Sequence, residues 1–156
     1  MKRHASLVPL SRDHHDGLLL ATRLQQRRNA LLRLWSHDPF WQADYVVKFF
    51  EDHLSPHFEA EEKILFPVSE PFLEEKKELI EKLLQEHEDM RSFVQSFRQP
   101  EEKKLECNLE QFGKLLEEHI RCEEREFFPL CEQAIHPEAL EDIRLKIEEY
   151  RPQGTR

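Results

Sequence analysis

Residues 57–67 read HFEAEEKILFP and residues 119–129 read HIRCEEREFFP, so the chain uses one eleven-residue phrase twice, 62 positions apart. Each copy places a His four residues before a Glu, and the two pairs are His57 with Glu61 and His119 with Glu123. Four residues make about one helical turn, so each His shares a helix face with its Glu, with Cβ atoms roughly 5–6 Å apart. Apolar residues continue both faces, and a carboxylate among core-facing side chains costs free energy unless it is paired or binds metal. The repeat therefore predicts a buried cation site on helices.

The composition favours an all-α fold. The chain has 156 residues, only three glycines and many Leu, Glu, Lys, Arg and Gln residues, which are good helix formers. We expect one domain over residues 1–156 with its core at about 7–150. Long helices are expected at about 11–35, 40–66, 72–97 and 101–134, with a short fifth helix at about 138–149. In the first helix Ser11 is the candidate N-cap, and the side chains expected to pack inward are Leu18, Leu19, Leu24, Leu31 and Leu32. Short connections favour an up-down-up-down four-helix bundle, and Pro56 predicts a kink in the second helix.

Charge and cysteine content narrow the class of protein. The net charge of −9 argues against nucleic-acid binding. Three cysteines without a Cys-x-x-Cys motif are typical of a reducing compartment. No apolar stretch is long enough for a signal peptide or a membrane span. These features predict a cytoplasmic protein with neither a membrane nor a nucleic acid as partner.

The other two long helices add histidines on apolar stripes. His87 lies on such a stripe, and in the first helix His14 is favoured over His15 because its face is more apolar. Four imidazoles and two carboxylates exceed the four ligands of one zinc ion. They suit two first-row metal ions bridged by Glu61 and Glu123, with an oxide or hydroxide bridge offsetting further charge. Imidazole and carboxylate ligands are compatible with iron, which we favour, and with manganese or zinc.

Several neighbours are alternatives. Glu62 and Glu124 follow the two carboxylates by one residue and point about 100° away, so we expect them in solvent or behind the ligands. His53 lies one turn before His57 and is a candidate to line the pocket. The Asp-His pair at 13–14 also aligns, weakly, with the Glu-His pair at 86–87.

Four segments resemble the hemerythrin-like (HHE cation-binding) domain family. In chain order they are SRDHHDGL at 11–18, HLSPHFEAEEKILFP at 53–67, LLQEHEDMR at 83–91 and LLEEHIRCEEREFFP at 115–129. The resemblance implies a four-helix bundle that holds a non-haem di-iron centre. The ligands that it implies are His14, His57, Glu61, His87, His119 and Glu123.

The chain departs from the invertebrate oxygen carriers of that family in two ways. Those carriers supply two histidines from the third helix, whereas only His87 stands at such a position here. Their last carboxylate is also spaced one residue further from its His, which would point to Glu124 rather than Glu123. A missing histidine leaves room for an exogenous ligand and argues against simple oxygen carriage.

We therefore expect a centre that binds oxygen, nitric oxide or peroxide for storage, sensing or detoxification. Binding is favoured over turnover, because no general acid or substrate pocket is visible in the sequence. One alternative is a di-iron oxidoreductase or an iron-donating repair protein. The other is an iron sensor or interaction module whose fold is stabilised by the bound metal. The redox partner and the oligomeric state stay open.

Overall fold

A computed structural model describes residues 2–26 and 35–151, and residues 1, 27–34 and 152–156 lie outside the described part. Every regular element of the described chain is helical, which confirms the all-α prediction. The α-helices are α1 (Val8–Gln26), α2 (Pro39–Phe49), α3 (Ser55–Ala60), α4 (Phe66–Ser69), α5 (Lys77–Arg98), α6 (Glu102–Cys122), α7 (Phe128–Ala134) and α8 (Pro137–Tyr150). Three π turns, η1 (Phe50–Leu54), η2 (Glu61–Leu65) and η5 (Glu123–Phe127), and two 3-10 turns, η3 (Glu70–Phe72) and η4 (Glu74–Lys76), complete the set.

Two helix starts differ from the prediction. The first helix begins at Val8 rather than Ser11, whose hydroxyl donates a hydrogen bond to Glu124 instead of capping a helix. The third long helix begins at Lys77 rather than residue 72, because the two 3-10 turns precede it. Leu73 joins these turns with φ −124° and ψ 38°, outside the helical region, and its buried side chain anchors the connection. The predicted end of the first helix, with Leu31 and Leu32, lies outside the described residues.

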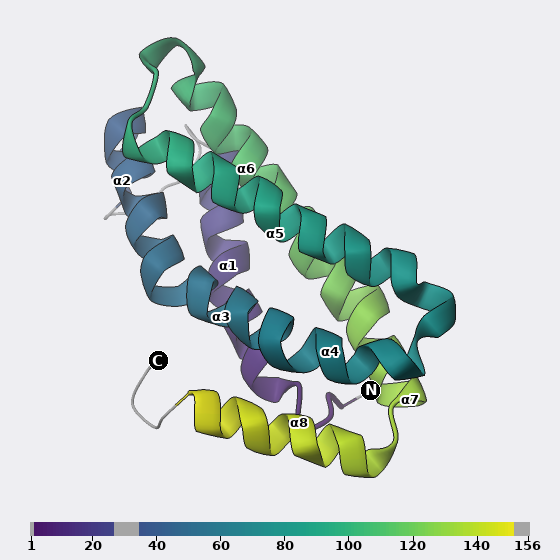
Figure 1. Ribbon diagram of the computed structural model, residues 1–156. Coiled ribbons are helices and arrows are strands. Elements are labelled where there is room, and N and C mark those ends of the chain that lie inside the picture. Colours follow the sequence, from purple (N-terminus) through teal and green to yellow (C-terminus); the bar gives the residue numbers. More distant parts are fainter. Residues whose placement is uncertain (1, 27–34, 152–156) are drawn as a thin grey trace.

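Each π turn ends two residues before a proline, and these prolines are Pro56, Pro67 and Pro129. The residue just before the proline donates its N–H to a carbonyl five residues back in all three places. A proline has no N–H for the carbonyl four residues back, and its ring crowds that carbonyl. The wider turn relieves this crowding, so helical structure continues from residue 39 to 69 and from 102 to 134. Figure 1 shows the chain bending between α2 and α3, where the kink at Pro56 was predicted.

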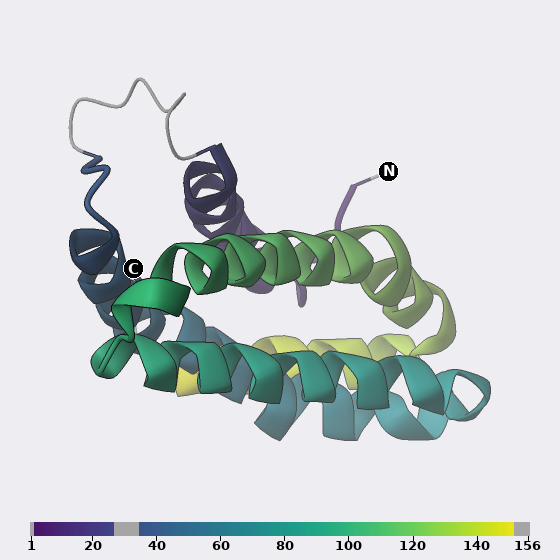
Figure 2. The same cartoon turned by 90° about the horizontal axis from the view of Figure 1, so that it is seen from above.

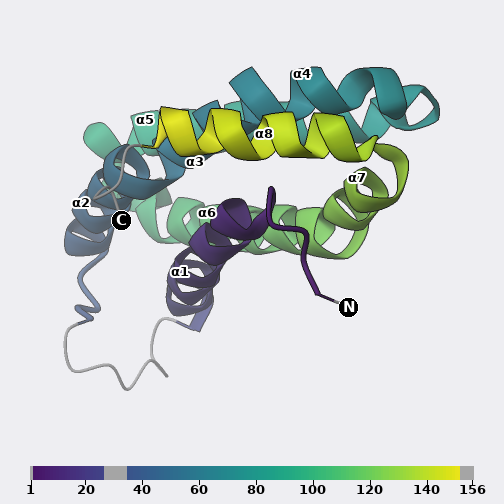
Figure 3. The same cartoon turned by 90° about the horizontal axis from the view of Figure 1, so that it is seen from below.

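The long helices pack side by side. Helix α1 packs against α6, α2 packs against α5, and α5 runs along α6 (Figures 1 and 2). The last helix, α8, contacts η2 and lies alongside α3 and α4 in the view from below (Figure 3). No helix in the described part of the chain is long and apolar enough to span a bilayer.

Buried apolar side chains form two clusters at different levels of the helices. The first cluster includes Leu24, Val46, Phe97 and Phe112. The second includes Leu7, Phe66, Phe127 and Ile143, so it joins the start of the chain to α8. Leu19, which we predicted to face inward, is instead 45% exposed. Leu20, one residue later, is buried in its place.

Helices α1 and α6 approach closely at Gly113. A Cβ atom at this position would lie 2.9 Å from Leu24 Cβ and 3.0 Å from the carbonyl oxygen of Ala21. Both are rigid parts of α1, so the absence of a side chain allows the two helices to meet. This contact fixes α1, and with it His14, against the helix that carries His119 and leads into Glu123.

Candidate metal centre

Six buried polar side chains meet between the two apolar clusters. They are His14 on α1, His57 on α3, Glu61 at the start of η2, His87 on α5, His119 on α6 and Glu123 at the start of η5. Each is at most 3% exposed. Along α1 the order is Leu10 of the second cluster, His14, then Leu20 of the first, so the imidazole lies at the boundary. The structure therefore brings together all six residues that the sequence singled out.

The six side chains form two overlapping groups that could each hold a metal ion. One group is His14, His57, Glu61 and Glu123, and the other is Glu61, His87, His119 and Glu123. Within each group one ligand atom per residue lies within 4.8 Å of all the others. Both groups need the same two carboxylates, so Glu61 and Glu123 stand between them.

Each shared carboxylate presents one oxygen to each group. Glu61 Oε1 lies 3.0 Å from His57 Nε2, and Glu61 Oε2 lies 3.1 Å from His87 Nε2. Glu123 Oε2 lies 3.7 Å from His14 Nε2, and its other oxygen contacts His119 Nε2. This is the arrangement expected of two carboxylates that bridge a pair of ions.

The inward atoms fit a cation. His14 Nε2 and all four oxygens of Glu61 and Glu123 are buried and lack a hydrogen-bond partner among the described residues, although imidazole nitrogens lie close by. The Nε2 atoms of His87 and His119 also face each other at 3.2 Å. With metal–ligand bonds of about 2.1 Å, neighbouring ligand atoms at right angles lie about 3.0 Å apart. A metal ion bound by these atoms would explain why they lie so close together without forming hydrogen bonds. Without an ion, the buried and unpaired carboxylates would cost free energy.

A second carboxylate lies behind each imidazole. His57 Nδ1 donates to Asp13 Oδ2 at 2.8 Å and His119 Nδ1 donates to Glu86 Oε1 at 3.1 Å. His14 Nδ1 donates to Glu124 at 2.7 Å, whereas His87 Nδ1 lies 3.6 Å from Glu62, too far for a hydrogen bond. A proton on Nδ1 leaves Nε2 free to bind a metal, and such carboxylates also fix the ring orientation.

These contacts follow an internal twofold relation. The acid just before His14 supports His57, and the acid just before His87 supports His119. The acid just after Glu123 supports His14, and the acid just after Glu61 lies beside His87. Each half therefore has one such contact within its own helix pair and receives one carboxylate from the other pair, in the same pattern, as the repeated sequence motif leads one to expect.

Two phenyl rings cover the imidazoles on opposite sides of the centre. Phe58 stacks on His87 with ring centroids 3.9 Å apart and an interplanar angle of 14°. Phe128 stacks on His14 at 5.4 Å and 12°. Both rings are buried, so each of these imidazoles has one face covered by an apolar side chain.

The electrostatics of the centre favour positive charge. Burial lowers the pKa of His57, but the carboxylates of Glu61 and Asp13 raise it to about 10. Burial also lowers the pKa of His119, but Glu123 and Glu86 raise it to about 10. Burial and the charge of Glu61 raise the pKa of Glu123. The negative charge that stabilises protonated imidazoles in the metal-free centre would stabilise bound metal cations in the same way.

The remaining candidates lie outside the centre. His15 is exposed, as is His53, which lines a surface cleft with Tyr45 and Phe49 rather than the buried site. Glu62 and Glu124 lie behind the imidazoles, in the outer position that the sequence favoured for them. Their geometry selects Glu123 over Glu124 as the inward carboxylate of α6–η5.

Sequence reasoning missed the role of Asp13 and Glu86. The alignment of the Asp-His pair with the Glu-His pair contained the signal, because both acids precede a candidate ligand by one residue. Helical geometry turns each acid about 100° away from that ligand and toward the neighbouring helix. Only the packing of that neighbour shows which imidazole the acid reaches.

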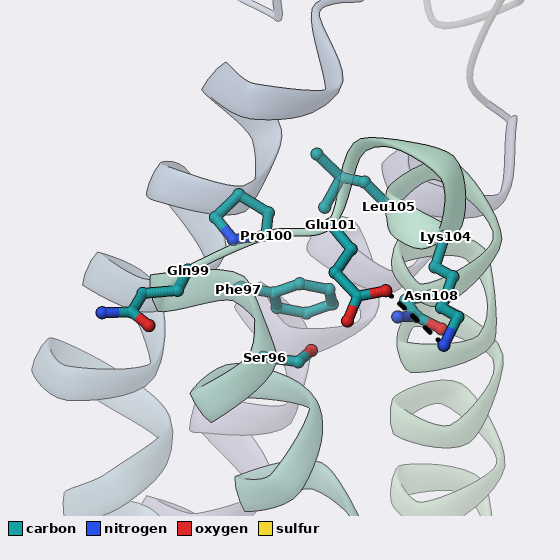
Figure 4. A pocket seen from close by; sticks show the side chains of 8 residues that line it. All are labelled: Ser96, Phe97, Gln99, Pro100, Glu101, Lys104, Leu105 and Asn108. Carbon is teal, nitrogen blue, oxygen red and sulfur yellow. Dashed lines mark ion pairs between the residues drawn. The ribbon is translucent and has the colours of Figure 1, made fainter.

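A cleft at the C-terminal end of α5 has no comparable cluster of buried His and Glu side chains among the described residues that line it. It lies at the turn between α5 and α6, with Phe97 beneath it, and its lining side chains are mostly neutral (Figure 4). The ion pair drawn there joins Lys104 to Glu101 at 3.5 Å, and both side chains are more than 70% exposed. Exposed pairs of this kind contribute little to stability or binding.

The model of the hemerythrin HHE cation-binding domain matches residues 12–131. The chain belongs to this family. The matched span covers more than half of the chain and contains all six inward side chains, which confirms the resemblance seen in the sequence. Hemerythrin domains bind cations, and this chain has two groups of buried His and Glu residues that could hold them. Comparisons with characterised proteins and with solved structures gave no match.

Proposed function

We propose that the chain binds two iron ions and uses them to bind a small molecule: oxygen, nitric oxide or peroxide. His14 and His57 would hold one ion, His87 and His119 the other, and Glu61 and Glu123 would bridge them. One observation supports this most strongly, namely that each bridging carboxylate offers one oxygen to each pair of imidazoles. In this proposal the long helices form an up-down-up-down four-helix bundle with α8 as a short fifth helix.

The donor set supports iron over harder cations. Two imidazoles and two carboxylate oxygens per ion suit first-row divalent metals, whereas magnesium and calcium prefer oxygen alone. Iron held by imidazoles and carboxylates would supply reversible electron transfer to a bound diatomic molecule. Iron accepts up to six ligands, so four protein ligands per ion would leave coordination positions open for an exogenous ligand, as in other non-haem iron sites.

The side chains of the protein would control what reaches the ions. Phe58 and Phe128 cover His87 and His14 and keep bulk water out. The carboxylates behind His57, His119 and His14 would keep Nδ1 of these imidazoles protonated and Nε2 available. The centre would therefore bind a small, weakly polar molecule rather than an organic substrate.

Metal content and absorption test the proposal. Protein purified without chelator and loaded anaerobically with Fe²⁺ should retain two ions per chain and develop visible absorption on exposure to air. Glu61→Gln should lose both ions, because this residue serves both halves, whereas Glu118→Gln, at an exposed position just before His119, should retain them. Fewer than one ion in the wild type would contradict the proposal.

A second role is favoured by the burial of Glu61 and Glu123. Both carboxylates are 0% exposed, and metal binding would neutralise charge that the fold otherwise has to accommodate. The ions would then also stabilise the structure, as in an iron sensor whose folding follows metal supply. Thermal unfolding with and without chelator tests this, and equal melting temperatures would exclude it.

A further inference from the structure

The segment before α1 attaches to the outer side of His14 through Arg3. Arg3 Nη2 donates to the carbonyl of Glu124 at 3.0 Å and lies 2.7 Å from its Oε2, while Nη1 pairs with Glu132. The guanidinium also lies 5.3 Å from the ring centroid of Phe128. Glu124 and Phe128 are the two residues that hold and cover His14. Arg3 therefore touches both supports of this imidazole.

The end of α8 attaches to the outer side of His57 through Arg151. Arg151 Nη2 lies 2.5 Å from Asp13 Oδ2, the same oxygen that accepts the hydrogen bond of His57 Nδ1. One residue earlier, the hydroxyl of Tyr150 donates to Glu59, which lies between His57 and Glu61 in the sequence. The end of this helix is thereby tied to the carboxylate that orients the imidazole.

The His87–His119 half is supported differently. Glu62, beside His87, binds Arg91 on α5, with Arg91 Nη2 2.6 Å from Glu62 Oε1. Glu86, behind His119, has no arginine partner among the residues that the structure describes. All of these residues lie on the long helices and within the family match at 12–131, whereas Arg3 and Arg151 lie outside it.

We propose that the two segments that flank the family match form a latch on the His14–His57 half of the centre, through Arg3 on Glu124 and Arg151 on Asp13. The latch makes metal retention at this half depend on the flanking segments, while the other half depends on the long helices alone. Arg3 and Arg151 are positioning residues, since they act on the imidazoles through carboxylates. This inference rests on the proposed dinuclear metal site.

The physical basis is a difference in local stability. Arg3 and Arg151 lie just outside helices α1 and α8, and segments outside the packed helices open more readily than the helices do, without unfolding of the whole structure. Arg3 and Arg151 are about one-fifth exposed, so water competes for their contacts. When the latch opens, Glu124 and Asp13 lose a charged partner and hold the imidazoles less firmly. The ion at the His14–His57 half is then the first to leave.

Iron retention tests the latch. Wild-type protein, the double variant Arg3→Ala/Arg151→Ala and the control Lys2→Ala/Arg144→Ala are loaded anaerobically with Fe²⁺ and passed over a chelating resin. Lys2 is exposed next to Arg3, and the Arg144 ion pairs are confined to α8. The double variant should keep one ion, with the weaker site losing affinity about tenfold or more. The wild type and the control should keep two.

Further substitutions in the double variant identify the remaining half. Adding His87→Ala should remove the last ion, whereas adding His14→Ala should change nothing. A merely structural role of the arginines would release both ions together, and that result would overturn the latch. Two ions in the double variant would overturn it as well. A wild type that keeps no iron would instead overturn the proposed function.

Circular dichroism reports whether the double variant folds. If it does not, Arg3→Lys/Arg151→Lys keeps the charges but loses the paired donors of the guanidinium. This milder variant should show one tight and one weakened ion. Two ions of unchanged affinity in the lysine variant would count against the latch.

Discussion

Asp13 and His57 are joined by a hydrogen bond of 2.8 Å between Oδ2 and Nδ1, although they lie 44 residues apart on different helices. The Glu86–His119 contact repeats this relation in the other half of the centre at 3.1 Å. These bonds determine which imidazole nitrogen faces the shared carboxylates. The outer acids therefore help to set the geometry in which the inward residues meet.

Removal of such an acid should weaken metal binding. Asp13→Ala leaves His57 without the partner that fixes its ring, so affinity at this half should fall about 10–100-fold. The measurement is a competition titration of the iron-loaded protein against a chelator of known affinity. Asp16→Ala, an exposed acid on the same helix, is the control and should bind as the wild type does. Equal affinities for both variants would show that the bond to His57 is not needed.

Two adjacent histidines should differ completely in effect. His14 is 3% exposed and faces the centre, whereas His15 points to solvent. His14→Ala should reduce iron from two ions per chain to one, and His15→Ala should leave both in place. Metal analysis after desalting gives the ratio directly. Iron loss in His15→Ala with retention in His14→Ala would reverse the assignment.

The metal-free protein should lose stability as the pH rises. Folding raises the pKa of His57 and of His119 from the ordinary 6.5 to about 10, because carboxylates outweigh the effect of burial. A group that binds its proton more tightly in the folded state stabilises fully below its unfolded pKa, and the effect disappears as pH passes the folded pKa. The free energy of unfolding should therefore fall between pH 6.5 and pH 10.

Urea denaturation at several pH values measures this dependence. The protonation of His57 and His119 would be responsible if the variant His57→Gln/His119→Gln showed a flat profile over the same range. A metal-free wild type whose stability is constant from pH 6.5 to 10 would contradict the assignment of raised pKa values to these imidazoles.

Two glycines should respond differently to replacement by alanine. At Gly113 the new Cβ would press on Leu24 Cβ and on a backbone oxygen of α1, neither of which can move without displacing the helix. At Gly17 the Cβ would meet only Ile120 Cδ1, 2.8 Å away at the end of a flexible side chain. Alanine gains about 1 kcal/mol of helix propensity at either site.

We expect Gly113→Ala to lower the free energy of unfolding by about 1–2 kcal/mol, because overpacking outweighs the gain in propensity. Gly17→Ala should be close to neutral. Urea denaturation of the two variants measures the difference. Equal stabilities would mean that α1 and α6 can separate without cost at this contact.

Much of the centre could be predicted from the sequence because its residues repeat. The paired His-x-x-x-Glu phrases indicated four of the inward side chains, and apolar stripes selected His87 and favoured His14 over His15. Burial confirms that these side chains face the interior. Their service as ligands stays a prediction, as do the identity of the metal and the single-domain organisation.

The parts that the sequence did not reveal depend on contacts between distant segments or on the backbone. The π turns follow from proline chemistry but change the register of the helix, which side-chain periodicity does not show. The outer acids at Asp13 and Glu86 were visible only as a weak alignment, since their partners lie on neighbouring helices. Leu19 was assigned to the wrong face because a run of three leucines gives no periodicity to separate its members.

Glu62 and Glu124 each reach across from one hairpin to a histidine of the other. The hairpin of α1 with α2–α4 supplies Glu62 to the imidazole on α5, and the hairpin of α5 with α6–α7 supplies Glu124 to the imidazole on α1. One hairpin alone thus leaves its lone histidine without support. Each hairpin therefore depends on the other for the outer carboxylate of its own histidine, so the centre is complete only when both hairpins pack together.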